Sequence, residues 1–330
     1  MGAIQAQDYN MSKWALGIRL PGSTQKSIEA ALDKGEIIRT HLLRPTWHIV
    51  SAENIYWMLE LTAPRIKASM KSRHKQLELT KEVITKCLNI IEDNLTRKIN
   101  LTREELAGEL EKSNISTKKD NRLSHILLLA ELEGLICNGA AKGKKNTYAL
   151  LKERVPSVKR LGREEALAKL ASTYFASHGP ATLQDFTWWS GLTITDAKLA
   201  MEMIKSDFHS EKTGTQTFLF DNNFSINEKY WESAYLLPAF DEFIISYKDR
   251  SIIVSSEEQN RIISRNGMFW PVLLMNGQAV GTWKKVNNSG NVIVEISYFP
   301  GNTLCSNKNI ETLIEKEIEI YINFLGTKTK

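Results

Sequence analysis

The chain has 330 residues, of which 42% are hydrophobic and 25% charged, the composition of an ordinary globular protein. A chain of this length predicts two or three domains. We expect neither a membrane span nor a secretory signal, because no apolar run approaches the roughly 20 residues of a spanning helix and the start lacks a basic segment followed by an apolar one.

The charge is distributed unevenly. Residues 1–165 hold 28 Lys and Arg against 20 Asp and Glu, a net charge of +8, whereas residues 166–330 hold 15 against 18, a net charge of −3. A basic N-terminal half favours a polyanionic partner, and ordinary surface variation remains the alternative. The three cysteines, Cys87, Cys137 and Cys305, are far apart and odd in number, which indicates reduced thiols in a cytoplasm.

Two side-chain amides, Gln5 and Gln7, stand two positions apart near the start. Residues at i and i+2 point apart on a helix but share a face on an extended segment. In an extended segment or a loop the two amides can therefore aim at one point, where each offers an acceptor oxygen and two donors to a water or a base edge. From these residues alone, two exposed polar side chains in a flexible terminus are the simpler interpretation.

A partial structural unit is predicted next, with a helix over 27–32 and strands over 37–42 and 47–50. The same order returns twice, and each return opens on a helix-start signal. Thr102-Arg-Glu-Glu105 is a capping box, and Thr182-Leu-Gln-Asp185 repeats it with aspartate. By comparison with these two copies, the first helix of the front copy is expected upstream of the chain.

Each helix-start signal is followed by a turn and a second helix, over 122–135 and 195–204, where apolar residues recur at helical spacing. Hairpins are predicted after them, over 136–150 and 209–220. Helix, turn, helix and two-stranded wing is the winged-helix order. Coincidence among short helices is the alternative, but three copies favour a genuine repeat. The first wing tip carries three cations that suit phosphate contacts: Lys142, Lys144 and Lys145.

Beyond residue 235, strands are predicted over 251–254, 271–275 and 291–296, and Asn276-Gly277 indicates a hairpin turn. An amphipathic helix over 309–324 follows. The fold class is therefore α+β, with tandem winged-helix modules followed by a small antiparallel β-barrel-like domain with a C-terminal helix. The expected domains are a partial first winged helix with a connecting helix (1–76), a second (77–155) and third (156–235) winged helix, and the barrel-like domain (236–330).

No phosphate loop, dinucleotide-binding fingerprint, zinc-hydrolase helix or nucleophile elbow occurs in the sequence. The six histidines show no metal-ligand spacing, although His41 and His48 are expected on facing strands. We therefore expect no metal and no cofactor.

Several stretches resemble the AlkZ/YcaQ-type winged-helix DNA glycosylases. Each is moderately specific, and together they follow the family order over essentially the whole chain. The matching stretches are 2–9 with 13–15, 39–41 with 43–48, 236–241, 247–250 and 276–283. The resemblance implies three tandem winged helices and a β-barrel-like domain around duplex DNA. It also implies hydrolysis of the N-glycosidic bond of bulky N-alkylated purines, including the unhooking of interstrand crosslinks.

The catalytic Gln-x-Gln motif of the family falls on Gln5 and Gln7. A related branch has Asp at the second position, so Gln7 places the chain nearer the branch associated with genotoxin self-resistance. In the family a longer stretch precedes the motif and forms the opening helices of the first winged helix, whereas here the motif begins at Gln5.

The chemistry of the lesion explains why glutamines suffice. An N7-alkylated purine is cationic and leaves without a proton, so no strong general acid is needed. A glutamine amide is too weakly basic to be a general base, but it can orient a water and aim its carbonyl dipole at the developing oxocarbenium charge. Asp8 could supply basicity, and a local cap or turn is the favoured role for it.

DNA contacts are expected from Arg44 and His48 near the active cleft, through phosphate or sugar. Trp47 is expected in the core. Asp249 and Arg250 are interpreted as a structural ion pair, with a DNA contact through Arg250 as the second option.

The leading hypothesis is a monofunctional DNA glycosylase whose partner is double-stranded DNA with alkylated or crosslinked bases. We expect a cytoplasmic, nucleoid-associated bacterial monomer with no membrane partner. The alternative is a non-catalytic winged-helix DNA-binding protein or transcriptional regulator, which would read bases in the major groove. A protein-interaction scaffold, which would show no salt-dependent DNA binding, is the third hypothesis.

Overall fold

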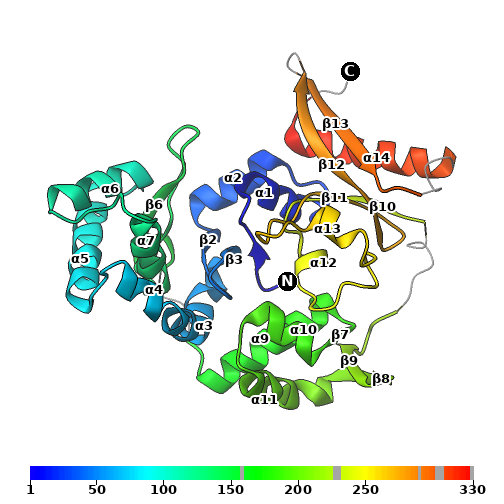
Figure 1. Ribbon diagram of the computed structural model, residues 1–330, viewed down its shortest axis with the longest axis horizontal. Helices are drawn as coiled ribbons and strands as arrows, with labels where there is room; N and C mark the ends of the chain where they lie inside the picture. The colour runs from blue at the N-terminus through cyan, green and yellow to red at the C-terminus, as the bar shows by residue number, and fades with distance from the viewer. Residues whose placement is uncertain (157–159, 226–231, 289–290, 302–307, 328–330) are drawn as a thin grey trace. The chain divides into compact units, whose positions relative to one another are not determined.

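The computed structural model describes residues 1–330 except 157–159, 226–231, 289–290, 302–307 and 328–330 (Figure 1). The chain divides into two compact units, each assembled from three segments. Unit 1 contains residues 1–3, 30–174 and 190–204, and unit 2 contains residues 4–29, 175–189 and 205–330. The division into modules that ends at residues 76, 155 and 235 remains a proposal.

The front of the chain combines short strands with helices. Its elements are β1 (Ile4–Gln5), α1 (Tyr9–Gly17), α2 (Gln25–Lys34), β2 (Ile37–His41), β3 (Trp47–Ser51), the 3-10 turn η1 (Ala52–Asn54), α3 (Ile55–Ser69) and α4 (Lys71–Gln76). The predicted helix over 27–32 and both predicted strands are confirmed by α2, β2 and β3. The expectation of a first helix upstream of the chain was wrong, because α1 precedes α2 within it.

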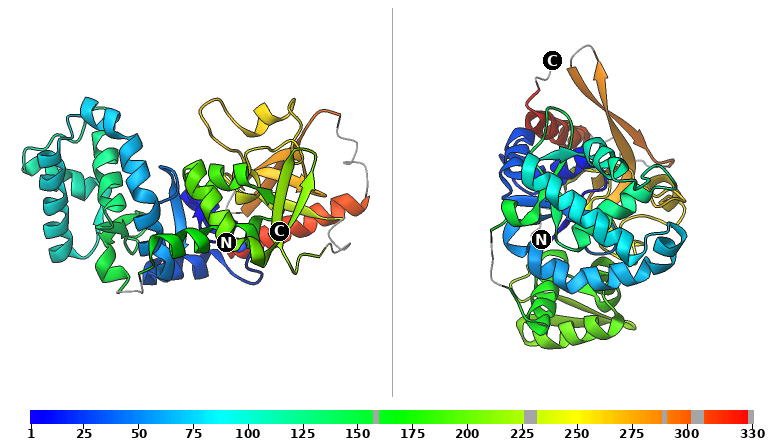
Figure 2. Two further views of the ribbon diagram at one scale, coloured as in Figure 1. Left: turned by 90° about the horizontal axis from the view of Figure 1, so that it is seen from below. Right: turned by 90° about the vertical axis from the view of Figure 1, so that its left-hand side faces the viewer.

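The middle of the chain forms a compact module that stays together in both views of Figure 2, coloured cyan to green. Its elements are α5 (Lys81–Lys98), β4 (Leu101–Thr102), α6 (Arg103–Lys112), α7 (Arg122–Leu132), β5 (Ile136–Asn138), β6 (Thr147–Leu150) and α8 (Leu151–Arg154). The capping box at Thr102 and Glu105 is present in both directions. The strands pair in the order β4-β6-β5, over a core of buried leucines and isoleucines from α5, α6 and α7.

The next part repeats this order. Its elements are α9 (Arg163–His178), β7 (Ala181–Thr182), α10 (Leu183–Ser190), α11 (Ile194–Ile204), the 3-10 turn η2 (Lys205–Asp207), β8 (Phe208–Thr213) and β9 (Gln216–Asp221). The strands pair as β7-β9-β8, which matches the order of the middle module. Within the described residues, the succession strand, helix, helix, strand, strand therefore occurs three times, starting at β1, β4 and β7.

One kind of capping signal starts the first helix of each copy. Asp8 accepts hydrogen bonds from the backbone N–H groups of Asn10 and Met11 at the start of α1. Thr102 caps α6, and Thr182 accepts from the N–H of Asp185 at the start of α10. A side chain that satisfies the free N–H groups of the first turn fixes where each helix begins.

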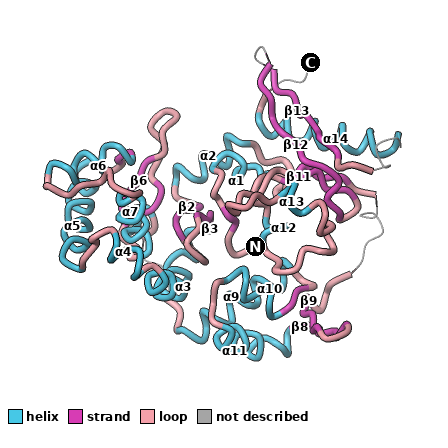
Figure 3. Tube along the Cα trace, in the orientation of Figure 1, coloured by secondary structure: helices cyan, strands magenta, loops and turns pink. Residues whose placement is uncertain are grey.

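The last part of the chain is an antiparallel sheet with one long helix. Its elements are β10 (Ala234–Leu237), α12 (Glu242–Ile245), α13 (Gln259–Ile262), β11 (Val272–Met275), β12 (Gln278–Asn288), β13 (Asn291–Tyr298) and α14 (Lys308–Leu325). The sheet order is β10-β11-β12-β13. Figure 3 shows β12 and β13 as a long hairpin with α14 beside it. The predicted hairpin turn at Asn276-Gly277 is confirmed by the pairing of Met275 with Gln278.

The predicted strand over 251–254 was wrong. The N–H groups of Ile253 and Val254 both bond the carbonyl of Arg250, at 2.9 Å each, which closes a turn. Ile252 points outward while its two apolar neighbours are buried. Composition alone does not separate an apolar turn from a strand. The two differ in where the backbone N–H groups bond, and here they bond a carbonyl only three and four residues back.

An aromatic cluster joins α1 to α14 inside unit 2. Trp14 lies 5.0 Å from the ring of Tyr321 and 5.1 Å from that of Phe324, and Tyr321 also contacts Trp283 of β12. A Cβ at Gly17 would lie 2.5 Å from the Phe324 ring, so only glycine lets the helices approach this closely. The start of the chain is therefore packed directly against its last helix.

Two further findings bear on the expectations from sequence. Cys87 and Cys137 are free, buried thiols, and Cys305 lies outside the described residues. In the ranges that the structure covers, no helix has both the length and the apolar character required to cross a bilayer.

Candidate active site

The segment that carries Gln5 and Gln7 is non-helical, as the sequence predicted. Gln5 ends β1 and is buried, whereas Gln7 is exposed in the bend that leads into α1. Both residues lie in unit 2, directly before the N-cap of a helix. The two amides thus stand on a short stretch whose two ends are fixed by β1 and by the Asp8 cap.

The backbone of Gln5 is held by a carboxylate from far along the sequence. The Gln5 N–H donates to Oε1 of Glu242 at 2.6 Å, across 237 residues of chain. Glu242 lies in the first turn of α12 and is only 1% exposed. A charge-assisted hydrogen bond of this length is among the stronger ones in proteins.

The other oxygen of Glu242 is also occupied. Its Oε2 accepts from Nε1 of Trp189 at 3.0 Å and from Oγ of Ser246 at 2.5 Å, and Nε2 of His178 lies 3.9 Å away. A buried carboxylate is tolerated only when its lone pairs are satisfied in this way. Gln5 is therefore attached to a polar centre made by α9, α10 and α12.

The neighbouring residue Asp241 strengthens the same region. Both of its carboxylate oxygens accept from the guanidinium of Arg19, at 2.8 and 2.7 Å, in a two-point pair. Burial opposes the charge of Arg19, but the nearby Asp241 outweighs it and the pKa of Arg19 is raised. Asp241 also caps α12 by accepting from the N–H of Phe243. The first and the last segment of unit 2 are thus tied together by the pairs Gln5–Glu242 and Arg19–Asp241.

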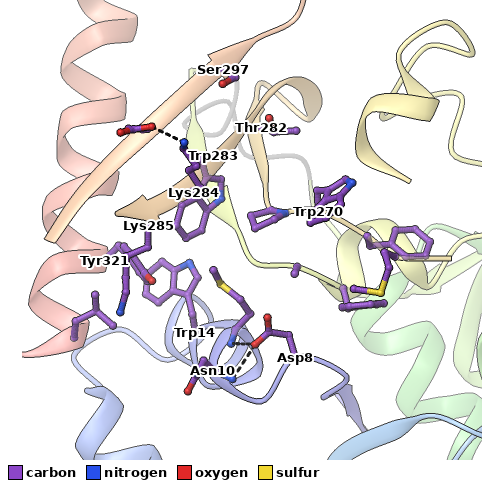
Figure 4. A pocket seen from close by; sticks show the side chains of 18 of the residues that line it. Asp8, Asn10, Trp14, Trp270, Thr282, Trp283, Lys284, Lys285, Ser297 and Tyr321 are labelled. Atoms are coloured by element: carbon purple, nitrogen blue, oxygen red, sulfur yellow. Dashed lines mark hydrogen bonds and ion pairs between the residues drawn. The ribbon is translucent and has the colours of Figure 1, made fainter. Parts of the chain in front are cut away.

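Asp8 has the capping role that the sequence favoured. Its Oδ1 accepts from Asn10 N and Met11 N at 3.0 Å each. The carboxylate is exposed and lines a cavity of about 780 Å³ in unit 2, which Figure 4 shows. The pKa of Tyr321 is raised to about 12, mainly by the burial of its hydroxyl and to a smaller extent by the negative charge of Asp8. The Asp8 carboxylate therefore faces the same space as the Tyr321 hydroxyl.

His48 is placed differently from the expectation. Its side chain is 0% exposed, and Nδ1 lies 3.0 Å from the carbonyl of Thr46. Burial first, and then the charge of Arg44, lowers the pKa of His48 to about 3. A buried, neutral imidazole offers neither surface nor charge to a phosphate, so the proposed DNA contacts no longer include it.

Arg44 lies in unit 1 on a turn with left-handed backbone, φ +49°, close to Gly191. It lines a cavity of about 230 Å³ together with Arg65 and Arg163. Arg163 is paired with Asp196 at 2.8 Å. Arg44, Arg65 and Arg163 thus line one cavity, and the charge of Arg44 also acts on the buried His48.

The facing strands predicted for the front copy are present as β2 and β3, with Thr40 opposite His48 and His41 opposite Trp47. Nδ1 of His41 contacts the carboxyl group of the buried Glu131 of α7, so His41 has a structural partner. Trp47 is half-buried and packs against the core of the middle module, as expected for a core residue.

The three wing lysines lie on an exposed hairpin tip. Lys142 and Lys145 exchange backbone hydrogen bonds at 3.0 and 3.1 Å around Gly143 and Lys144. Lys142 also pairs with Glu105 at 3.1 Å. The tip projects from the module as the green loop above β6 in Figure 1, which keeps Lys144 and Lys145 accessible.

Arg250 is a buried side chain rather than a surface cation. It is 9% exposed, its Nε donates to the carbonyl of Ile244 at 2.7 Å, and its guanidinium lies over the rings of Trp188 and Phe269. Asp249 accepts from the N–H of Ser251. The structure supports a packing role for Arg250, and the proposed DNA interface omits it.

Sequence reasoning missed Glu242. The available signal was a carboxylate followed directly by the apolar run Phe243-Ile244-Ile245, which indicates a buried acid. Over the described residues, no group of three or more His, Cys, Asp or Glu side chains is arranged to hold a metal ion.

Comparison with known proteins identifies the family. Residues 1–318 match the family described as DNA glycosylase AlkZ-like. This chain belongs to the AlkZ-like DNA glycosylase family. The resemblance found in the sequence is thereby confirmed, and so is the expectation of a DNA glycosylase acting in DNA repair.

A sequence match and a structural match, both from Streptomyces sahachiroi, are similar to this AlkZ-like chain. An interstrand DNA cross-link repair glycosylase is 23% identical over 309 residues, which cover 86% of this chain and 80% of the relative. The structure of the DNA glycosylase AlkZ matches with a TM-score of 0.78 at 18% identity, over 98% of this chain and 89% of that one. At this identity the structural likeness shows the fold alone.

Proposed function

We propose that this AlkZ-like glycosylase hydrolyses the N-glycosidic bond of N7-alkylated purines in duplex DNA, with Gln5 and Gln7 holding the attacking water. The observation that carries the proposal is the fixed backbone of the Gln-x-Gln segment, held by Glu242 and by the Asp8 cap. Positioned amides are useful in catalysis only if their supports limit their freedom.

The reaction balances without a general acid. The oxygen of water forms a bond to C1′ of the deoxyribose as the C1′–N9 bond breaks. The electron pair of that bond passes to the purine, which neutralises its cationic ring. The attacking water loses one proton to solvent, so the products are an abasic sugar and a neutral N7-alkylpurine. The amide carbonyl dipoles of Gln5 and Gln7 stabilise the positive charge that develops on the sugar.

Asp8 is assigned a structural part in this scheme. Its Oδ1 is used twice in capping α1. The carboxylate can still attract a cationic lesion through its charge, since it is exposed beside the cavity. Proton removal from a water that attacks an oxocarbenium-like centre needs little basicity, so Asp8 is not required as a base.

DNA contacts are proposed for the wing lysines and for Arg44. Lys142, Lys144 and Lys145 stand at an exposed tip, where cations bind phosphates independently of sequence. We also propose that the three strand–helix–helix–strand–strand copies act as tandem winged helices on one duplex, with the sheet of β10–β13 as a further domain. The name of the relative extends the proposed substrates to interstrand crosslinks. A monomer in the cytoplasm, associated with the nucleoid, is the proposed working state.

The test is release of free N7-methylguanine from methylated duplex DNA. We expect wild-type protein to release the base, and Gln5→Ala/Gln7→Ala to retain DNA affinity while losing at least about 100-fold in single-turnover rate. Gln278→Ala, which changes an exposed glutamine on β12, is the matched control. Equal rates in the double variant and the wild type would refute the role of the two amides.

A further inference from the structure

Unit 2 contains a cavity that the hydrolytic step does not use. It has a volume of about 780 Å³, within the range of roughly 300–1,000 Å³ typical of small-molecule sites. Asp8 lines it, and because consecutive Cα atoms are about 3.8 Å apart, the backbone of Gln7 lies next to its wall. The candidate catalytic segment therefore borders the cavity.

One wall of the cavity is a rigid aromatic surface. Trp14, Trp283 and Tyr321 lie side by side around it, as Figure 4 shows. All three are almost completely buried, and the indole N–H groups of Trp14 and Trp283 are bound to the carbonyls of Leu236 and Leu237. The two indole N–H groups are satisfied, so the tryptophans offer only ring surface, and the Tyr321 hydroxyl is the polar group of this wall.

The opposite wall carries large apolar side chains that are exposed to solvent. Trp270 is 49% exposed and Met268 is 44% exposed, and both line the cavity. They stand on a small hairpin closed by the bridge between Ile263 and Phe269 and by the bond from Ser264 N to the carbonyl of Met268. The hairpin is thus built to hold its residues in place.

The alternation along this hairpin separates core from surface. Residues at i and i+2 of an extended segment share a face, so Met268 and Trp270 point one way and Phe269 the other. Phe269 packs against Phe240, with ring centroids 5.9 Å apart, and under the guanidinium of Arg250. Phe269 also lines the cavity, but these contacts partly bury it, so Met268 and Trp270 are the exposed members of the three.

The charges around the cavity are mixed. Lys284 pairs with Glu295 and Arg261 with Glu258, while Asp8 and Lys285 carry opposite charges along the lining. Selection in this cavity would therefore come from its apolar side chains. An N7-alkylated purine is positively charged, and its substituent is the part that distinguishes one lesion from another.

We propose that this cavity is a specificity site for the apolar, planar substituent of an alkylated purine, which stacks on Trp270 and contacts Met268 while Gln5 and Gln7 act on the sugar. The inference rests on the proposed function. It names bulky aryl-bearing N7 adducts as the preferred substrate class, and it makes Trp270 a specificity residue rather than a catalytic one.

The test compares two lesions in the same duplex, N7-methylguanine and N7-benzylguanine, at enzyme concentrations below saturation. We expect Trp270→Ala to lower release of N7-benzylguanine by about 5- to 150-fold, the loss typical of one aromatic stack. Release of N7-methylguanine and affinity for unmodified duplex should change less than about twofold, because the methyl group does not reach the stack. Met268→Ala should shift the same ratio in the same direction by a smaller factor.

The control is Ile293→Ala, which removes a similarly exposed apolar side chain from β13 outside the cavity. It should leave both rates unchanged. Equal rate losses for both lesions in Trp270→Ala, or no loss for either, would overturn the specificity site while the glycosylase proposal survives. Wild-type protein that releases neither base would instead overturn the proposed function itself.

Discussion

The Glu242 carboxylate provides the sharpest test of how the Gln-x-Gln segment is supported. It accepts from three donors, the Gln5 N–H, the Trp189 indole N–H and the Ser246 hydroxyl. Glu242→Gln keeps the size of the side chain but replaces one acceptor oxygen with an NH₂ group. If the amide oxygen faces Gln5, the NH₂ group faces the Trp189 N–H; if it is reversed, the NH₂ group faces the Gln5 N–H.

Either orientation leaves a buried donor opposite another donor. An unsatisfied buried donor costs about 1–3 kcal/mol, so we expect a lower midpoint of thermal unfolding. In the reversed orientation the Gln5 backbone must also move away from α12. Because a misplacement of about 1 Å can cost on the order of 100-fold in rate, we expect single-turnover release of N7-methylguanine to fall by about 10- to 100-fold at a temperature where the variant is fully folded.

Ser246→Ala is the matched control for this prediction. It removes one donor to Oε2 and leaves Oε1 bonded to Gln5, so stability should fall slightly and the rate should stay within about threefold of wild type. DNA affinity should be unchanged in both variants. A Glu242→Gln protein that is less stable yet releases the base at the wild-type rate would show that Glu242 serves only the core.

Two further predictions concern DNA binding and pH. The pair Lys144→Ala/Lys145→Ala should weaken binding to all duplexes alike and reduce the slope of log K against log salt concentration by about 1.8, since each phosphate contact contributes about 0.9; an unchanged slope in a salt titration would remove the wing from the interface. Because the folded-state pKa of His48 is lowered to about 3 from a usual value of 6.5, the unfolded chain binds the extra proton below pH 6.5. The contribution of His48 to stability is therefore complete above that pH and falls by about 1.4 kcal/mol per pH unit between 6.5 and 3. Denaturant unfolding of wild type and His48→Gln as a function of pH should show this slope only in the wild type, and parallel curves would contradict it.

The local signals in the sequence were good guides to the elements. The capping box at Thr102 and Glu105 marks the start of α6, and Asn276-Gly277 marks the hairpin between β11 and β12. These signals work because they depend on hydrogen bonds between residues a few positions apart. The strand expected over 251–254 failed for the same reason, since Asp249 and Arg250 close a turn there with local bonds.

The environment of the candidate site could not be read from neighbouring residues. Gln5 was identified by its motif, but its partner Glu242 lies 237 residues away. His48 looked like a surface cation because alternation along β3 does not reveal that both faces of the strand are covered. Burial and long-range pairing depend on how whole segments pack, which a motif does not encode.

Because the ribosome makes the chain from its N-terminus, the Gln5–Glu242 hydrogen bond can form only late in synthesis. Synthesis proceeds at about 5–20 residues per second, so the Gln-x-Gln segment exists for on the order of ten to fifty seconds before its carboxylate partner is made. During that interval the donor N–H of Gln5 must be satisfied by water or by a temporary partner. Unit 2 can therefore mature only after its first and last segments meet, and ribosome complexes stalled before residue 242 should expose the front segment to protease. A nascent chain that is protected there would show that the front folds without its distant partner.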